Sequence, residues 1–273
     1  MRWRKPGARS KSTAWLFRRR ISTSSGSIGR RSLDSSGAED PSDVRVELKV
    51  AGQETAYDRL RMALEIQSEG IRRLYPPRQV QSVYLDSHFG RALEENLAGV
   101  SHREKRRFRW YGTESTEVVG KLELKVRENT LGWKRIVAVD RPMRVAGADR
   151  TGFVRALAAG VPLAWRDGLS GLEPTQWISY RREYLATADL AVRLTIDRQL
   201  RTWDQRPRLR LGDDPMSENR GPRIFILELK CAPAALHIAE GIVRRLPWPV
   251  GRCSKFVLAS DPTHGPVPSL EPL

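Results

Sequence analysis

Apolar and charged residues alternate along several short stretches of the chain, a period of two that is typical of β-strands with one buried face. The pattern is clearest over 45–50 (RVELKV) and 121–127 (KLELKVR), where aliphatic side chains alternate with charged ones. Further strands are predicted at 82–86, 101–111, 177–185, 191–198 and 223–230. The chain is therefore expected to contain many strands, each with one aliphatic face and one charged face.

A period near 3.6 residues predicts helices between these strands. Apolar side chains fall on one helical face over 57–64 and over 151–173, and shorter helices are predicted at 91–97 and 234–245. Prolines and glycines over 205–222 predict a long loop. Strands interspersed with helices in this way indicate an α+β domain.

The two ends of the chain have a different composition. Residues 1–42 are rich in Arg and Ser, with no acid before Asp34, and are too polar to fold alone. Such a start is typical of an organelle transit peptide, but a basic tail, or a start codon placed too early, is the simpler interpretation. We expect a tail at 1–42, a folded domain at 43–262 and a loose end at 263–273. Deletion of residues 1–40 is expected to leave activity and melting temperature almost unchanged.

The chain is strongly basic. Its 273 residues include 48 Lys and Arg against 32 Asp and Glu, a net charge of +16, which favours anionic partners such as nucleic acid, anionic lipid or phosphate chains. The two cysteines, Cys231 and Cys253, form no CxxC pair, so neither a zinc site nor a disulfide framework is expected. This usage indicates a reducing, cytoplasmic compartment. No apolar run approaches the roughly 18 residues of a membrane helix, and no membrane segment is predicted.

The charged faces of the predicted strands carry an excess of positive charge. A single charged face is usually just solvated, but the repetition predicts that these faces line the interior of a barrel. Such an interior needs a multiply charged anion, because unpaired buried charges are costly, and arginine binds phosphate oxygens in a bidentate manner. Its carboxylates suit Mg²⁺ or Mn²⁺. The basic residues are Arg45, Lys49, Arg103, Lys105, Arg107, Arg109, Lys125, Arg127, Arg182, Arg193, Lys230 and Lys255, and the acidic ones are Glu47, Glu123, Asp197 and Glu228.

The order of eight short segments resembles the VTC domain, the polyphosphate-polymerase branch of the triphosphate tunnel metalloenzymes in the CYTH-like superfamily. Each segment alone is a weak signal, but their order from Val44 to Ala259 is specific. The segments are RVELK at 45–49, SVYLD at 82–86, REKRRFRWYG at 103–112, LELKVR at 122–127, SYRREY at 179–184, RLTID at 193–197, ILELK at 226–230 and SKF at 254–256. The resemblance implies an antiparallel eight-stranded β-tunnel with flanking helices, in which the γ-phosphate of ATP is transferred to a growing polyphosphate chain.

The resemblance also implies roles for single residues, with a divalent metal, Mn²⁺ or Mg²⁺, as cofactor. ATP and polyphosphate are the implied partners. Glu228 would be the principal metal ligand, assisted by Glu47. The implied catalytic residues are Lys49, Lys105, Arg107, Arg109, Lys125 and Arg182, and the implied substrate-binding residues are Arg193, Lys230, Lys255 and Glu123.

Other interpretations of the same residues stay open. The hydrolase branch of these enzymes opens with ExExK, whereas here Arg45 replaces the first acid, which favours a polymerase. A triphosphate or tripolyphosphate hydrolase, and a non-catalytic module that binds polyphosphate or inositol phosphate, are the alternatives. A nucleic-acid binder ranks last, because the charges alternate along strands and form no stripe with stacking aromatics.

Several single residues also have plainer interpretations. Glu47 is as well suited to pairing with Lys49 or Arg45 as to binding metal. Glu123 is better suited to orienting a neighbouring arginine than to binding metal. Asp197 could cap a turn. Trp110 and Tyr111 end a predicted strand, where they are expected to pack rather than to stack on a base.

Overall fold

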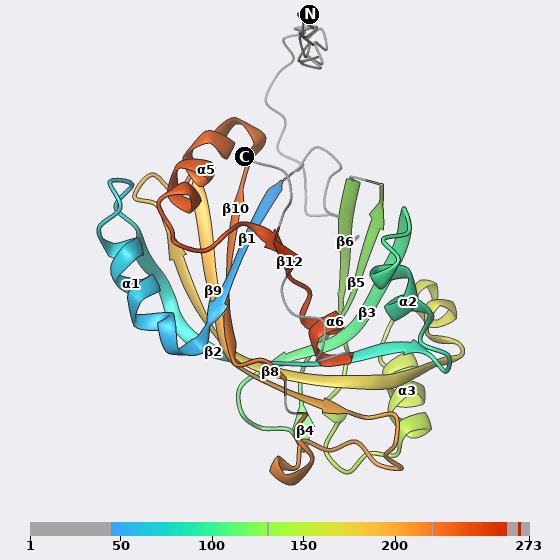
Figure 1. The fold of residues 1–273 in the computed structure, drawn as a ribbon. Helices are drawn as coiled ribbons and strands as arrows, with labels where there is room; N and C mark the ends of the chain where they lie inside the picture. Colours follow the sequence, from blue (N-terminus) through green and yellow to red (C-terminus); the bar gives the residue numbers. More distant parts are fainter. Residues whose placement is uncertain (1–44, 130, 220, 261–266, 269–273) are drawn as a thin grey trace, which may run out of the picture. The chain divides into compact units, whose positions relative to one another are not determined.

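Eight antiparallel strands form one curled sheet in the computed structural model, which describes residues 45–129, 131–219, 221–260 and 267–268 (Figure 1). In spatial order they are β1 (Val46–Gln53), β10 (Ile224–Cys231), β9 (Val192–Asp204), β8 (Leu172–Ala186), β2 (Arg72–Ser87), β3 (His102–Tyr111), β5 (Lys121–Glu128) and β6 (Leu131–Ala138). The expected antiparallel eight-stranded sheet is thus confirmed. No pairing joins the edge strands β1 and β6 within the described residues, so the sheet there is a half-barrel rather than a closed one.

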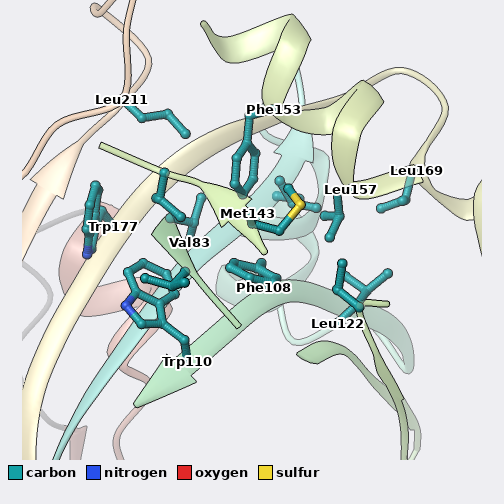
Figure 2. Packing of buried hydrophobic residues seen from close by; sticks show 14 of the residues in the cluster. Val83, Phe108, Trp110, Leu122, Met143, Phe153, Leu157, Leu169, Trp177 and Leu211 are labelled. Atoms are coloured by element: carbon teal, nitrogen blue, oxygen red, sulfur yellow. The ribbon is translucent and has the colours of Figure 1, made fainter. Parts of the chain in front are cut away.

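Helices cover part of the convex side of the sheet. The helix α1 (Tyr57–Glu65) and the helix α5 (Leu236–Arg244) pack on β1, β10 and β9, and Leu60 and Leu64 of α1 are buried there. The helix α3 (Arg150–Ala159) inserts Phe153 and Leu157 into a second core, beside Phe108, Trp110 and Leu122 of the sheet (Figure 2). Burial of these helical faces, with alternate residues of each strand, explains the periods seen in the sequence.

Two short helices lie on the concave side. They are α2 (Arg91–Leu97) and α6 (Lys255–Ser260), which form a small core with the concave faces of β2 and β8. The remaining elements are α4 (Leu163–Arg166), four 3₁₀ turns, the pair β4 (Glu117–Val118) with β7 (Met143–Arg144), and the pair β11 (Gly251–Arg252) with β12 (Val267–Pro268). None of the described helices has the length and apolar composition needed to cross a membrane.

The structure differs from the expected elements in three places. Strand β6 was not predicted, because on this edge strand two charged residues, Lys134 and Arg135, follow the exposed Trp133 and break the alternation. The helix expected over 151–173 is split near Gly160 and Pro162, and β8 already begins at Leu172. Strand β2 starts ten residues before the predicted 82–86.

The expected ends of the folded domain are only partly covered by the structure. The predicted tail at 1–42 lies outside the described residues. Of the expected loose end at 263–273, the described residues Val267 and Pro268 pair with Arg252 and Gly251 as β12.

Candidate active site

The charged residues of β1 and β10 lie on the concave side because the aliphatic residues between them are buried beneath α1 and α5. Leu48 of β1 and Leu227 and Leu229 of β10 belong to that core. Lys49 is paired with Glu228 in the register of the two strands, and Glu47 with Lys230. Since directly paired residues point to the same face, the two acids and two bases meet on the concave surface.

Each of these lysines bridges the two carboxylates. The Nζ of Lys49 lies 2.8 Å from Oε1 of Glu47 and 3.5 Å from Oε1 of Glu228, and the Nζ of Lys230 lies 3.6 and 3.5 Å from their Oε2 atoms. Burial opposes ionisation of Glu47, but Lys49, Lys125 and Lys230 outweigh it and lower its pKa to about 2. Lys255, Lys49, Arg182 and Lys230 likewise outweigh burial and lower the pKa of Glu228, so both carboxylates are ionised at neutral pH.

Asp197 of β9 joins this group from the neighbouring strand. Its carboxylate is almost fully buried and accepts two hydrogen bonds from Arg182, from Nε at 2.5 Å and from Nη2 at 2.6 Å. The Nζ of Lys255 in α6 lies 2.5 Å from Asp197 and 3.5 Å from Glu228. The interpretation of Asp197 as a turn cap is wrong, because it lies within a strand and pairs with two bases.

Two arginines of β3 are held in fixed positions by a carboxylate and two tyrosines. Arg107 donates from Nε to Glu123 at 2.7 Å and from Nη1 to the hydroxyl of Tyr84 at 2.6 Å. Arg109 donates from Nη2 to the hydroxyl of Tyr180 at 3.1 Å and lies 3.4 Å from Glu123. Burial raises and the two arginines lower the pKa of Glu123, which falls to about 2. This geometry fits the interpretation of Glu123 as a residue that orients arginines.

Lys105 has no carboxylate partner among the described residues. Its Nζ donates to the hydroxyl of Ser254 at 2.9 Å, and burial together with Lys125, Lys49 and the neighbouring arginines lowers its pKa to about 7. Lys125 of β5 keeps contact with water, yet the surrounding protein and the charges of Lys49 and Lys230 lower its pKa. Glu47 of β1 and Glu228 of β10 oppose this shift and raise the pKa of Lys125, so the concave faces of β5, β1 and β10 face one another.

The strand register places the predicted site residues of the sheet on this concave side, and α6 adds Lys255. Arg193 lies there beside Lys230, but it is exposed and forms no ion pair with any other described residue. The prediction from the sequence did not include Lys134, because β6 was not predicted; its Nζ lies 3.3 Å from Glu123. It also missed Tyr84, Tyr180 and Ser254, although both tyrosines share the period-two face of the charged residues.

The donor set fits a divalent metal held jointly with substrate phosphates. Within the residues that the structure describes, no three His, Cys, Asp or Glu residues form a metal-binding group. Glu47 and Glu228, however, are both ionised and contact the same two lysines. Mg²⁺ is commonly bound by one or two carboxylates with phosphate oxygens completing its shell, and this pair can supply such ligands.

The arrangement suits the binding of a polyanion, and the two cysteines are not activated as nucleophiles. Burial raises the pKa of both thiols, Cys231 and Cys253, which keeps them protonated. Without the exposed Arg193, the candidate site comprises nine bases and four acids among the described residues, an excess of five positive charges. The bases are Lys49, Lys105, Arg107, Arg109, Lys125, Lys134, Arg182, Lys230 and Lys255, and the acids are Glu47, Glu123, Asp197 and Glu228. Fixed cations of this kind stabilise phosphoryl groups by position and charge.

Comparison with known proteins gives one family. The family model described as "VTC domain" matches residues 37–151 and 166–263. No curated protein matches the chain. Solved structures similar to this chain include a candidate adenylate cyclase of Bacillus halodurans, with 14% identity, 74% of this chain and 89% of that chain covered, and a TM-score of 0.42.

Two further solved structures are similar at the same distant level. One, from Hippeastrum, is described as a candidate adenylyl cyclase with a dominant triphosphatase activity; identity is 15%, 78% of this chain and 93% of that chain are covered, and the TM-score is 0.40. The other belongs to the Mediator head module of Schizosaccharomyces pombe, with 12% identity, 74% and 91% coverage, and a TM-score of 0.36.

Proposed function

We propose that this chain, which belongs to the VTC domain family, is a metal-dependent polyphosphate polymerase. A terminal phosphate oxygen of the acceptor chain would attack the γ-phosphorus of ATP, and the bond from that phosphorus to the β–γ bridging oxygen would break. The acceptor chain gains one phosphate and ADP leaves. The observation that carries the proposal is a surface with five excess positive charges, arranged by buried carboxylates.

The side chains would act by holding and neutralising phosphates. Arg107 and Arg109, fixed by Glu123, would contact the transferred group, and Lys105 would gain a proton as phosphate oxygens approach it. Glu228 and Glu47 would hold the divalent metal, Mn²⁺ or Mg²⁺, together with substrate oxygens. That ion would neutralise charge on the phosphates when bound.

The protonation of the site supports phosphate transfer to an acceptor chain over transfer to water. Attack by water needs a base that accepts its proton, and carboxylates with pKa values of about 2, such as Glu47 and Glu123, are poor bases at neutral pH. A phosphate oxygen of an acceptor chain is already ionised and needs no base. Arg45, which replaces the first acid of the hydrolase pattern, supports the same direction.

Hydrolysis of triphosphate or tripolyphosphate is the second candidate function. One observation favours it: Lys105, with a pKa of about 7, is partly neutral at physiological pH and could accept a proton from water. A module that binds polyphosphate without catalysis would use the same charged surface.

The deciding experiment is incubation of the purified full chain with ATP and Mn²⁺, followed by a gel that resolves long phosphate chains. Long chains would support the polymerase, free phosphate alone the hydrolase, and neither product the binding module. Arg107→Gln should abolish either product. Arg155→Gln, which changes an exposed arginine of α3, should leave the product and its rate unchanged.

A further inference from the structure

Three tyrosines and an arginine extend the concave surface beyond the arginines of β3. Tyr111 follows Arg109 by two residues on β3, and Tyr184 follows Arg182 by two residues on β8. Tyr184 points to the concave side because the next residue toward Arg182, Glu183, accepts a hydrogen bond from Tyr57 of α1 on the convex side. Alternation along the strands therefore places both rings next to the phosphate-binding arginines.

Strand β2 contributes the third tyrosine and the arginine. Tyr75 is paired with Tyr184, and Arg78 is paired with Arg182. An irregularity in the pairing between Tyr75 and Arg78, at the two prolines that separate them, turns both side chains to the same face although they are three residues apart. We call this group of four residues the tyrosine platform: Tyr75, Arg78, Tyr111 and Tyr184.

Contacts within the tyrosine platform are few and leave ring faces open. The rings of Tyr75 and Tyr184 meet edge to face with their centroids 6.0 Å apart, and Cζ of Arg78 lies 5.9 Å from the ring centroid of Tyr111. Tyr75 and Tyr111 are 56% and 51% exposed. No hydroxyl of the three tyrosines is hydrogen-bonded to another described residue, in contrast to Tyr84 and Tyr180, whose hydroxyls each accept from an arginine.

The platform is continuous with the candidate active site. Cζ of Arg182 lies 5.4 Å from the ring centroid of Tyr180, whose hydroxyl accepts from Arg109. Burial raises the pKa of Tyr184, and the charges of Arg182 and Arg78 oppose that rise, which places Tyr184 within electrostatic range of both arginines. The expected packing of Trp110 is confirmed, but Tyr111 does not pack into a core.

We propose that the tyrosine platform binds the nucleobase of a nucleoside triphosphate whose phosphates lie on the arginines of β3. Aromatic rings and guanidinium planes stack on the face of any base, and partly exposed rings beside a phosphate site are placed to do so. The four residues include no amide or carboxylate, so they would hold adenine and guanine alike. The inference rests on the proposed function only in that the arginines bind a triphosphate.

Binding measured without turnover tests the platform. Calorimetric titration of the full chain with β,γ-imido-ATP and with tripolyphosphate, both with Mg²⁺, compares a ligand that has a base with one that has none. Tyr111→Ala should weaken binding of the nucleotide about tenfold and of tripolyphosphate less than about twofold. Tyr111→Phe should keep wild-type affinity for both. Phe89→Ala, which removes an exposed ring outside the platform, is the control.

The alternative results are distinct. Equal weakening of both ligands in Tyr111→Ala would overturn the platform, because the ring would then act through the phosphate site or the fold. No weakening of either, or no binding of the nucleotide by the wild type, would overturn it as well. Nucleotide-selective weakening in a protein that makes no phosphate chains would support the platform and refute the polymerase, so the two proposals fail separately.

Discussion

Single residues of the candidate active site differ in how fully their charges are compensated. Each of its four carboxylates contacts at least two basic groups, and Asp197 is held by a bidentate arginine and a lysine. Lys105, by contrast, contacts the Ser254 hydroxyl and the ring of Phe256, has no carboxylate partner among the described residues, and is surrounded by other cations. In the ligand-free site, Lys105 is therefore the base whose charge is least compensated, and an incoming phosphate would relieve the most repulsion there.

Lys105 is expected to take up a proton when a triphosphate binds. Its pKa of about 7 leaves it mostly neutral near pH 8, and phosphate oxygens would return the pKa toward its ordinary value of about 10.4. Tripolyphosphate binding near pH 8 should therefore consume about one proton more in the wild type than in Lys105→Arg. The measurement is calorimetry in buffers of different ionisation enthalpy.

The Lys105→Arg variant is the matched control, because arginine keeps the charge and does not titrate in this range. Protons released by the ligand itself are common to both proteins and cancel in the comparison. Equal proton uptake by wild type and variant would show that Lys105 is already charged in the free protein.

Asp197→Asn is expected to lower the free energy of unfolding by about 3–5 kcal/mol, because it leaves Arg182 and Lys255 buried with less compensation. Asp204→Asn, which breaks a more exposed pair with Arg206, should cost less than about 1 kcal/mol. Guanidinium denaturation of the three proteins measures both. A loss below about 1 kcal/mol in Asp197→Asn would mean that Glu228 alone compensates the two bases.

The same substitution should alter the acid sensitivity of the fold. Burial raises the pKa of Asp197, but Arg182 and Lys255 outweigh it and lower that pKa below its ordinary value. A depressed carboxylate pKa contributes stability above the unfolded-state value of about 3.9, and that contribution is lost as the pH falls through the folded-state pKa. The unfolding free energy of Asp197→Asn should therefore fall less steeply below about pH 5 than that of the wild type.

At the scale of secondary-structure elements, α6 completes the site although it is only one and a half turns long. It carries Lys255 to Asp197 and Glu228, and the residue before it, Ser254, to Lys105. The ring of Phe256 anchors the helix by stacking on Tyr84, with centroids 5.0 Å apart. An isolated helix of this length would not be stable, so its position depends on that contact.

Phe256→Ala is expected to lower the free energy of unfolding by about 3–5 kcal/mol and to weaken tripolyphosphate binding, because the buried ring is lost and α6 is released from Tyr84. Phe256→Leu fills much of the space and should cost less than half as much. Denaturation and calorimetric titration measure the two effects. A variant that is destabilised yet binds tripolyphosphate as the wild type does would show that α6 contributes nothing to the ligand site.

The elements that the sequence predicts well are those with one face buried by a helix or a core. β1 and β5 alternate cleanly for that reason, and they carry Glu47, Lys49, Glu123 and Lys125. β6 is an edge strand whose Trp133 is exposed and is followed by two charged residues, so its sequence shows no clear period and Lys134 was not predicted.

Tertiary contacts explain the other omissions. The ring of Phe256 meets Tyr84, and the hydroxyl of Ser254 meets Lys105, only after α6 folds back onto the sheet. The tyrosine platform depends on the irregular pairing of β2 with β8, which a regular period of two cannot predict.

At the scale of the whole described domain, the curled sheet collects like charges from strands that are distant in sequence. The nine bases of the candidate site repel one another in the free protein, and the four carboxylates offset only part of this repulsion. A polyanion that binds the folded state and not the unfolded chain shifts the equilibrium toward the folded state.

Tripolyphosphate is therefore expected to raise the melting temperature. At about 100 times its dissociation constant the stabilisation is about 2.7 kcal/mol, which corresponds to about 5–10 °C for a domain of this size. Sulfate at equal ionic strength should give a much smaller shift, because it carries fewer charges and spans fewer of the bases. Arg107→Gln should reduce the tripolyphosphate shift, and an undiminished shift in this variant would place the ligand elsewhere on the basic surface.

The salt dependence of the ligand-free protein separates repulsion from ion pairing in the same site. Salt shortens the screening length from about 8 Å at physiological ionic strength to about 3 Å at 1 M. Pairs at 2.5–2.8 Å, such as Lys255 with Asp197 and Lys49 with Glu47, are screened little, whereas repulsion between more distant lysines is screened strongly. With NaCl as the salt, the melting temperature without ligand should rise, while the shift produced by tripolyphosphate should shrink. A fall in the ligand-free melting temperature would mean that attraction within the ion pairs outweighs the repulsion, and the polyanion would then stabilise the fold by direct contacts alone.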